Sequence, residues 1–249
     1  MHLNLSIIIP AYNEAKKIGA DITACTDFIK KYGFSSEIIV VDDGSTDTTA
    51  MQAESAAVPA DIDLKVITLK KHTGKGRAVK TGIIQSSGEL VMFADSGLCI
   101  PLEYALKGIR QVQDNNCHIA VGSRKHPHSI VVQDQGIYRK LCSWLFYRMA
   151  IHKFPELNYL SDMQCGFKIY KGDIARELFK KSRINGFMFD IEILMMAIQK
   201  GYKICNFPVK WTCDLDSRLT PARHWMVVLQ DLREIRKRIR PTQNKGHLP

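Results

Sequence analysis

The sequence predicts an α/β protein in which a mixed, mostly parallel sheet carries helices on both faces. Short β-branched apolar runs alternate with longer stretches of helical spacing through the first half of the chain, and this alternation is typical of parallel strands joined by crossover helices. Each apolar run also ends in polar residues. The 249 residues, 45% of them hydrophobic and 24% charged, exclude disordered, collagen-like and coiled-coil classes.

Five runs in the first half are predicted strands, because they are short, nearly continuous and rich in branched residues. They are residues 6–10, 37–41, 64–69, 90–94 and 118–121. Four stretches between them are predicted helices, and Pro101 stands where a proline is tolerated at a helix start. These helices are residues 14–32, 47–57, 76–85 and 101–114.

The second half has a different character. Residues 162–170 read as a loop that enters a strand, 190–200 as a helix and 202–211 as one strand. Apolar residues at helical spacing predict an amphipathic helix over 223–240. We therefore expect one main domain over residues 1–220, followed by a basic amphipathic helix and tail over 221–249.

Two basic segments suggest a partner that is anionic. Residues 217–249 contain eight Lys or Arg against two acids, within a chain of net charge +10. Residues 135–152 combine aromatic and basic side chains in a stretch too short to span a bilayer. An interfacial membrane helix and a core helix both remain open for that stretch. A nucleic-acid partner is not expected, because the basic residues accompany apolar aromatics and no nucleic-acid motif is present.

The seven cysteines are irregularly spaced and none forms a CxxC pair. This pattern suggests neither a disulfide framework nor a zinc site, so we expect reduced thiols in a cytoplasmic protein. No signal peptide and no membrane-spanning run are apparent.

Polar residues cluster after each of the five predicted strands, at 10–14, 42–47, 71–77, 95–97 and 122–124. Because ligands of open parallel sheets bind outside the carboxyl ends of the strands, these residues predict one cleft lined by acids, glycines and bases. Ordinary turn chemistry explains each cluster taken alone. The glycines after the third strand match neither a dinucleotide fingerprint nor a P-loop.

Two of these segments resemble a known family. SIIIPAYNE at 6–14 and IVVDDGSTD at 39–47 are similar to the opening of inverting family 2 glycosyltransferases, which have the GT-A fold. DMQCGFK at 162–168, FDIE at 189–192 and PVKW at 208–211 resemble the dolichyl-phosphate glucosyltransferases and mannosyltransferases, the glucosyl branch more closely. The resemblance runs over nearly the whole chain.

The resemblance implies a nucleotide-sugar site at the ends of the first four strands. Its residues would be Pro10, Ala11, Tyr12, Glu14, Asp42, Asp43, Lys75, Gly76, Asp95 and Ser96. Glu14 would accept hydrogen bonds from the ribose, and Asp43 or Asp42 from the base. A carboxylate can only accept, which suits uracil and guanine alike, so this feature does not decide between UDP and GDP sugars.

The same resemblance places Asp95 at the first acid of an Asp-x-Asp metal motif, for Mg²⁺ or Mn²⁺. Here the second acid is replaced by Gly97. We expect a weak metal site at Asp95, with Ser96, water or Asp162 filling the vacancy. The alternative is that Asp95 only orients the sugar and that the reaction needs no metal.

On the acceptor side, a lipid phosphate is already ionised and is itself the nucleophile. Such a reaction depends on cations that hold two phosphates close together, and Arg124, Lys168 and Arg139 are the candidates. Asp162 and Asp190 would orient the sugar or act as base. The simpler alternatives are a surface position for Lys168 and a helix N-terminus for Asp190.

These features predict a hexosyltransferase that moves glucose from UDP-glucose to a polyprenyl or dolichyl phosphate. It would work at the cytoplasmic face of a membrane, as a peripheral protein or with a separate membrane protein. Transfer of mannose from GDP-mannose and transfer to a glycan acceptor remain open. A nucleotide-sugar-binding protein that has lost catalysis is the rival from a different class.

Overall fold

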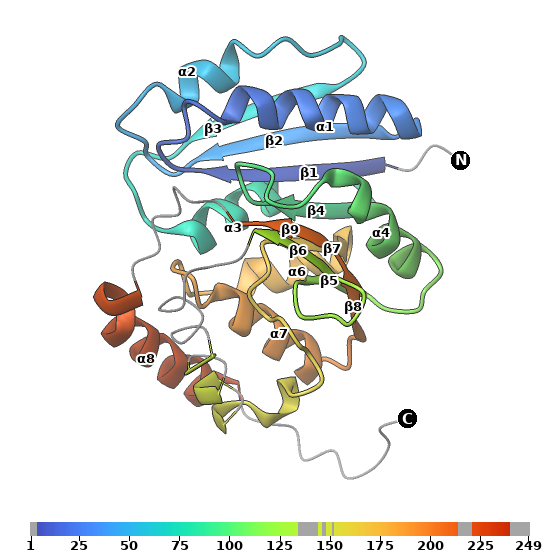
Figure 1. The fold of residues 1–249 in the computed structure, drawn as a ribbon. Coiled ribbons are helices and arrows are strands. Elements are labelled where there is room, and N and C mark those ends of the chain that lie inside the picture. Colours follow the sequence, from blue (N-terminus) through green and yellow to red (C-terminus); the bar gives the residue numbers. More distant parts are fainter. Residues whose placement is uncertain (1–3, 134–143, 146–147, 151, 214–220, 240–249) are drawn as a thin grey trace.

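The structure is a computed structural model that describes residues 4–133, 144–145, 148–150, 152–213 and 221–239. Its main sheet has seven strands in the order β3-β2-β1-β4-β7-β5-β8, and a second sheet pairs β6 with β9 (Figure 1). The strands are β1 (Asn4–Ala11), β2 (Ser35–Asp42), β3 (Asp63–Thr68), β4 (Leu90–Ala94), β5 (Ile119–Ser123), β6 (Ile130–Gln133), β7 (Phe167–Lys171), β8 (Ile204–Pro208) and β9 (Lys210–Thr212).

The main sheet is parallel except at one strand. β1 pairs in parallel with β2 and β4, and β5 pairs in parallel with β8. β7 lies between β4 and β5 and runs antiparallel to both. The predicted mixed, mostly parallel sheet is therefore confirmed, and the reversed strand brings the chain before Phe167 to the carboxyl end of β4.

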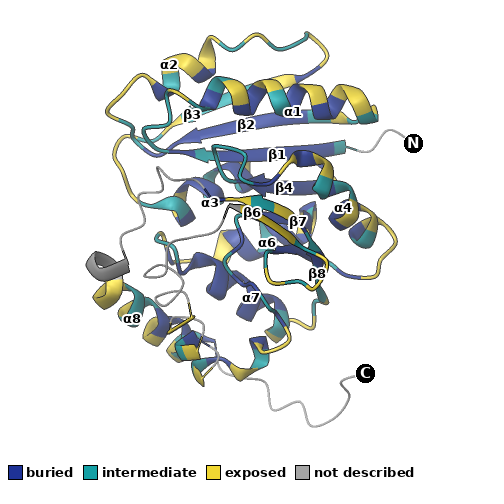
Figure 2. Cartoon of the chain, in the orientation of Figure 1, coloured by how far each residue is buried: buried dark blue, intermediate teal, exposed yellow. Residues whose placement is uncertain are grey.

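Helices cover both faces of the sheet (Figures 1 and 2). They are α1 (Ile18–Tyr32), α2 (Thr49–Glu54), α3 (Lys75–Gln85), α4 (Ala105–Gln113), α6 (Gly172–Lys181), α7 (Phe189–Gln199) and α8 (Pro221–Arg238). Alternation along the strands divides the core: Ile7 and Ile9 of β1 pack with α1 and α4, whereas Ile8 packs with α3, α6 and α7. Two short 3-10 turns lie at Leu102–Tyr104, directly before α4, and at Pro155–Leu157.

Of the described side chains of helix α8, those buried most deeply against the main body lie in its C-terminal half, while Val228 of the first half is partly buried against the same core. Leu232 and Ile235 of that C-terminal half, and Ile239 directly after the helix, are buried in the same cluster as α7. Trp225 and Met226, nearer its start, are exposed. A boundary near residue 220 stays a prediction. Of the helices within the described ranges, none combines the length and the apolar character needed to cross a membrane.

Several elements differ from their predicted bounds. The run 202–211 forms two strands in two different sheets, and α6 and β6 were not predicted at all. Helix α1 begins only at Ile18, because the Glu14 carbonyl accepts the Lys17 and Ile18 N–H groups in a turn before it. Most of the run 135–152 lies outside the described residues.

The prediction that all cysteines are reduced was wrong. A disulfide joins Cys117 to Cys205, while Cys25 and Cys165 are free thiols. Cys117 lies two residues before β5 and Cys205 lies in β8, so the pairing of these two strands brings the thiols together. Their separation of 88 residues in sequence gave no local signal for this contact.

Candidate functional site

The candidate site lies where the carboxyl ends of β1, β2 and β4 meet the chain that leads into β7. Ala94 of β4 is paired with Phe167 of β7, and the Asp95 N–H donates to the Gly166 carbonyl at 3.0 Å. The segment 162–168 therefore lies against Asp95, although about seventy residues separate the two in sequence.

At the carboxyl end of β2, two adjacent acids hold loops in place. Asp43 accepts the backbone N–H groups of Thr73 at 3.0 Å and Gly74 at 2.7 Å. Its Oδ2 also lies 2.8 Å from Nδ1 of His72. Asp42 accepts from the backbone N–H and the hydroxyl of Ser45. Both carboxylates are buried, so in this structure they hold the loops that form the walls of the site.

The end of β1 and the residues after it form the neighbouring wall of the site. Ala11 is buried and its carbonyl accepts the Asp43 N–H at 2.8 Å, while Pro10 is half-buried. The ring of Tyr12 stacks on His72 with centroids 3.9 Å apart. Glu14 donates its N–H to Thr49 and lies 3.6 Å from the Lys17 ammonium. This wall thus presents an aromatic pair beside a carboxylate, a combination suited to a base and a ribose.

Lys75 and Asp95 form an ion pair at the centre of the site. Lys75 is the first residue of α3, and its Nζ lies 2.6 and 2.8 Å from the two carboxylate oxygens of Asp95. Burial alone would lower the pKa of Lys75, but the charges of Asp95 and Asp190 outweigh it and raise that pKa. Lys75 therefore stays charged at neutral pH.

Two glycines permit close backbone contacts here. A Cβ on Gly166 would lie 1.9 Å from Oδ2 of Asp95, so only glycine lets segment 162–168 pass beside that carboxylate. A Cβ on Gly76, in the first turn of α3, would lie 2.7 Å from the Ile184 carbonyl oxygen. Gly76 therefore serves packing of the helix start, whatever else it contacts.

Ser96 turns away from Asp95 toward helix α1. Its hydroxyl donates to Asp21 at 2.6 Å, and the Gly97 N–H also reaches the Asp21 carboxylate, at 3.0 Å. Asp21 is buried. The expectation that Ser96 fills a metal position beside Asp95 therefore has no support in this geometry.

Asp162 is paired with Arg124, which follows β5. The guanidinium Nε and Nη2 lie 2.6 and 2.8 Å from the two carboxylate oxygens. Burial raises the pKa of Asp162, but the charge of Arg124 outweighs burial and lowers it. Such a bidentate pair fixes the Arg124 side chain, and it leaves Asp162 committed to Arg124 and not to an ion at Asp95.

Lys168 and Asp190 form a third pair, deeper in the protein. The Lys168 ammonium is completely buried and donates to Asp190 at 2.7 Å and to the Cys165 carbonyl at 2.6 Å. Burial raises the pKa of Asp190, and the charges of Lys168 and Lys75 offset this only in part. Lys168 is thus not a surface residue. Its burial favours a role in positioning Asp190 over direct contact with a phosphate.

The donor set for a metal at Asp95 is small. Within the described part of the chain, no group of three or more His, Cys, Asp or Glu side chains could hold an ion. Asp95 offers one carboxylate, which Lys75 already contacts. This fits only an ion that takes most of its ligands from substrate phosphates and water, as Mg²⁺ commonly does.

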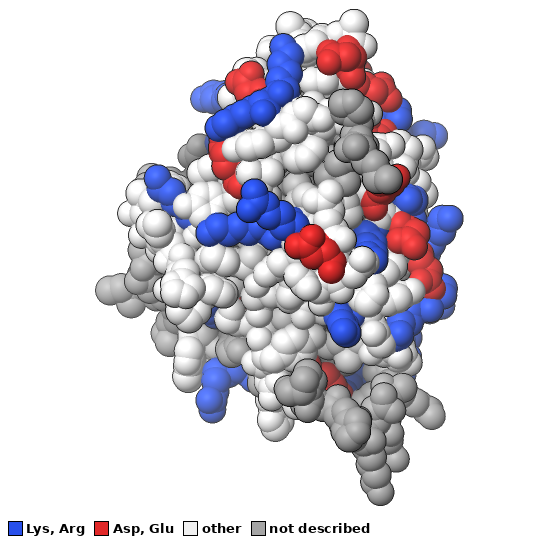
Figure 3. All heavy atoms as spheres, turned by 90° about the vertical axis from the view of Figure 1, so that its right-hand side faces the viewer, with Lys and Arg blue, Asp and Glu red and all other residues white. Residues whose placement is uncertain are grey.

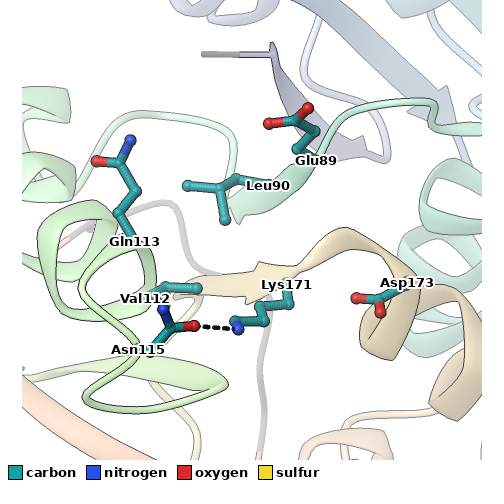
Figure 4. Close-up of a pocket in the computed structure, with 7 residues that line it drawn as sticks. All are labelled: Glu89, Leu90, Val112, Gln113, Asn115, Lys171 and Asp173. Atoms are coloured by element: carbon teal, nitrogen blue, oxygen red, sulfur yellow. Dashed lines mark hydrogen bonds between the residues drawn. The ribbon is translucent and has the colours of Figure 1, made fainter. Parts of the chain in front are cut away.

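Other surface features lie away from this site. A hollow of about 300 Å³ opens at the opposite end of the strands, between the start of β4 and the end of β7 (Figure 4). Acidic, basic and apolar side chains all line it. On the side of the molecule that carries α4, Lys and Arg are interspersed with Asp and Glu (Figure 3). The hollow shares no residue with the candidate site.

Three contributors to the site were not predicted. Asp21 could have been found as the acid on the buried face of α1, beside Ile18 and Ile22. His72 was noted only as part of a polar cluster. Glu192 lies in a quoted motif, but its partners, described below, are distant in sequence.

The comparisons with known proteins agree with this geometry. The family model described as "Glycosyl transferase family 2" matches residues 6–179. The chain is 32% identical to dolichyl-phosphate beta-glucosyltransferase of Homo sapiens over 94% of this chain and 75% of that protein. The corresponding Drosophila melanogaster protein is 30% identical, over 92% and 73%.

Among solved structures, glucosyl-3-phosphoglycerate synthase from Mycobacterium tuberculosis in complex with Mn²⁺, UDP and glucosyl-3-phosphoglycerate is similar in fold. The TM-score is 0.71 at 18% identity, over 98% of this chain and 83% of that one. Together with the sheet order and the family match, this similarity establishes a GT-A glycosyltransferase fold. The chain belongs to glycosyl transferase family 2.

Proposed function

We propose that this glycosyltransferase moves glucose from UDP-glucose to a dolichyl or other polyprenyl phosphate. The observation that carries the proposal is the placement of segment 162–168 against Asp95 by the reversed strand β7. A donor-side acid and acceptor-side Arg124 thereby share one end of the sheet. The dolichyl-phosphate beta-glucosyltransferases reported above support the same reaction.

The donor would bind along the ends of β1, β2 and β4. The base and ribose would lie by Tyr12 and Glu14, within walls that Asp42 and Asp43 hold. The diphosphate would lie at the start of α3, where a helix N-terminus favours anions. Lys75 would then exchange Asp95 for the phosphates, and Asp95 would be released to hold a divalent ion beside them.

The lipid phosphate would approach from the side of Arg124. One of its oxygens attacks the anomeric carbon as the bond from that carbon to the UDP oxygen breaks, so the configuration inverts. The leaving UDP carries away the electron pair, and Lys75 stabilises the developing charge. An ionised phosphate needs no base for this attack. Asp190, held by Lys168, would orient the sugar.

A divalent ion, Mg²⁺ or Mn²⁺, would be held by Asp95 together with the donor phosphates. It would supply charge neutralisation for the leaving diphosphate. The Mn²⁺ and UDP in the solved glucosyl-3-phosphoglycerate synthase support this proposal. The single carboxylate argues that the ion binds weakly without the nucleotide.

We further propose that the protein works peripherally on the cytoplasmic face of a membrane. Trp225, Met226 and Val227 of α8 are exposed, and so are Trp144 and Leu145. Exposed aromatic and aliphatic residues on a basic amphipathic helix suit an anionic bilayer surface. Binding to anionic vesicles that high salt reverses would support this; equal binding to neutral vesicles would refute the electrostatic part.

A donor panel tests the reaction. Purified protein is given UDP-glucose, UDP-galactose or GDP-mannose, with and without dolichyl phosphate in vesicles, and both nucleoside diphosphate and lipid-linked sugar are measured. We expect consumption of UDP-glucose that requires the lipid. Use of GDP-mannose alone, or release that a soluble sugar supports as well as the lipid does, would overturn the proposed donor or acceptor.

The metal is tested in the same assay with excess EDTA, followed by stepwise addition of Mg²⁺ or Mn²⁺. Activity should fall in chelator and return with the ion. UDP binding measured by calorimetry should strengthen with the ion in parallel. Full activity and unchanged UDP affinity in EDTA would remove the metal from the proposal and leave Lys75 as the main cation at the diphosphate.

A further inference from the structure

The loop between α6 and α7, residues 182–187, packs directly on the first turns of α3. The Arg77 N–H donates to the Asn185 carbonyl at 3.1 Å, and the Lys80 ammonium donates to the Ser182 carbonyl at 2.6 Å. Gly76 approaches the Ile184 carbonyl so closely that no side chain fits between them. The loop therefore sets the position of the helix start that carries Lys75.

One buried carboxylate holds this loop. Glu192 of α7 has no exposed surface, and its two oxygens accept the Arg183 N–H at 3.0 Å each. Its Oε2 also accepts the Ile184 N–H at 2.9 Å. These bonds fix the two residues that precede Asn185. The position of the loop depends on where the Glu192 side chain lies.

The cation that pairs with Glu192 comes from the end of α8. Arg238 Nη2 donates to Glu192 Oε1, and the next residue, Ile239, is buried. Helix α8 lies beside α7 at the lower left of Figure 1. A chain of direct contacts therefore runs from α8 through Glu192 and the 182–187 loop to α3.

We propose that Arg238 and Glu192 are positioning residues for the donor diphosphate. Through the 182–187 loop their ion pair sets the first turn of α3, and with it Lys75 and the loop that Asp43 holds. This inference rests on the proposed function only in taking the start of α3 as the diphosphate site. A purely structural pair would stabilise the fold without favouring one nucleotide phosphate over another.

The first test measures α3 in the free protein. Hydrogen exchange at residues 74–80 is compared between the native chain, Arg238→Gln and the control Arg233→Gln, which removes an equal charge from an exposed position of the same helix. We expect faster exchange in Arg238→Gln alone, because the Arg77 N–H bond to Asn185 weakens. Unchanged exchange at 74–80 would overturn the proposal.

The second test measures UDP and UMP affinity by calorimetry. Arg238→Gln and Glu192→Gln should lower the ratio of UDP to UMP affinity by roughly 3- to 30-fold, whereas Arg233→Gln keeps it. Arg238→Lys, which retains the charge, should recover part of the ratio, and it replaces Arg238→Gln if the latter does not fold. Equal loss for both nucleotides would show a merely structural role and overturn the proposal.

The two tests separate this proposal from the proposed reaction. If the native chain binds neither UDP nor UMP, the proposed donor is wrong, and the exchange measurement still decides whether Arg238 controls α3. If exchange responds but the UDP to UMP ratio does not, the positioning role toward the diphosphate is overturned.

Discussion

The two sides of the site use their carboxylates differently. On the proposed donor side, Asp21, Asp42 and Asp43 accept hydrogen bonds from backbone N–H groups of loops, whereas the more exposed Asp95 meets Lys75. On the acceptor side, each buried carboxylate meets a cation, as Asp162 does with Arg124 and Asp190 with Lys168. The first arrangement fixes the conformation of loops, and the second keeps each buried charge next to a charge of opposite sign. Loss of one partner should therefore loosen a loop on the donor side, whereas on the acceptor side it should leave a buried charge without its counter-charge.

The largest effect is expected from Lys168→Met. This change leaves Asp190 buried beside an apolar side chain, and loss of one partner of a buried pair typically costs about 3 to 5 kcal/mol. Urea unfolding of the native and variant proteins measures the loss. The double variant Lys168→Met, Asp190→Asn should regain much of the stability without regaining transfer. A single variant as stable as the native protein would break the comparison.

Glu37, near the start of β2 and at the other end of the sheet from the site, tests whether an acid with both kinds of partner behaves like a paired charge. It is buried and accepts from Ser6, from Ser87 and from the Lys65 ammonium. Burial would raise its pKa, but these hydrogen bonds together lower it to about 2. Glu37→Gln should lower the free energy of unfolding at pH 7 by about 2 to 3 kcal/mol.

The pH dependence of that loss follows from the lowered pKa. Stability from Glu37 is present above its unfolded value near 4.5 and disappears as the pH falls toward about 2. Unfolding curves for the native protein and Glu37→Gln should therefore converge in acid. Curves that stay parallel from pH 7 to the lowest pH tolerated would contradict the account.

Asp43→Asn tests whether a donor-side carboxylate that holds a loop affects nucleotide binding. The amide keeps the shape but loses one of the two oxygens that accept from Thr73 and Gly74. UDP binding should weaken by about 1 to 3 kcal/mol, measured by calorimetry, with little change in overall stability. The control is Asp61→Asn, an exposed acid with the same loss of charge. Unchanged UDP affinity would remove Asp43 from the site.

The smallest effect is expected for Asp231 of α8, which has acidic neighbours. Burial, together with Glu234 and Glu192, raises the pKa of Asp231 to about 6. Because the folded protein then holds its proton more tightly, stability falls as the pH rises from about 4 to about 6. Asp231→Asn should raise the free energy of unfolding by about 1 kcal/mol at pH 8. At pH 4 the two proteins should be equally stable; a variant no more stable at pH 8 would refute this.

Local patterns predicted the sheet and the loops at its carboxyl end, because strand ends and turn residues are encoded within a few positions. Tyr12, Asp43 and Asp95 were singled out for that reason, and the structure brings them to one end of the sheet; their roles stay predictions. The hydrogen-bond and ion-pair partners that support the site were not predictable, because they are distant in sequence. Asp21 lies 75 residues from Ser96, and Arg238 lies 46 residues from Glu192.

The reversal of β7 was also hidden from the sequence. A short apolar strand reads the same in either direction, since its side chains alternate with the same period. The direction is decided by the neighbours that it meets, here β4 and β5. The same dependence on distant neighbours explains why the disulfide between Cys117 and Cys205 was not predicted.

Gly166 carries an evolutionary consequence. Because a single methyl group at this position would collide with Asp95, a substitution in segment 162–168, on the proposed acceptor side, would first disturb the acid of the proposed donor side. In the proposed reaction, the two substrate sites could therefore not change independently at this contact. A side chain at position 166 would require a change at Asp95 in the same step.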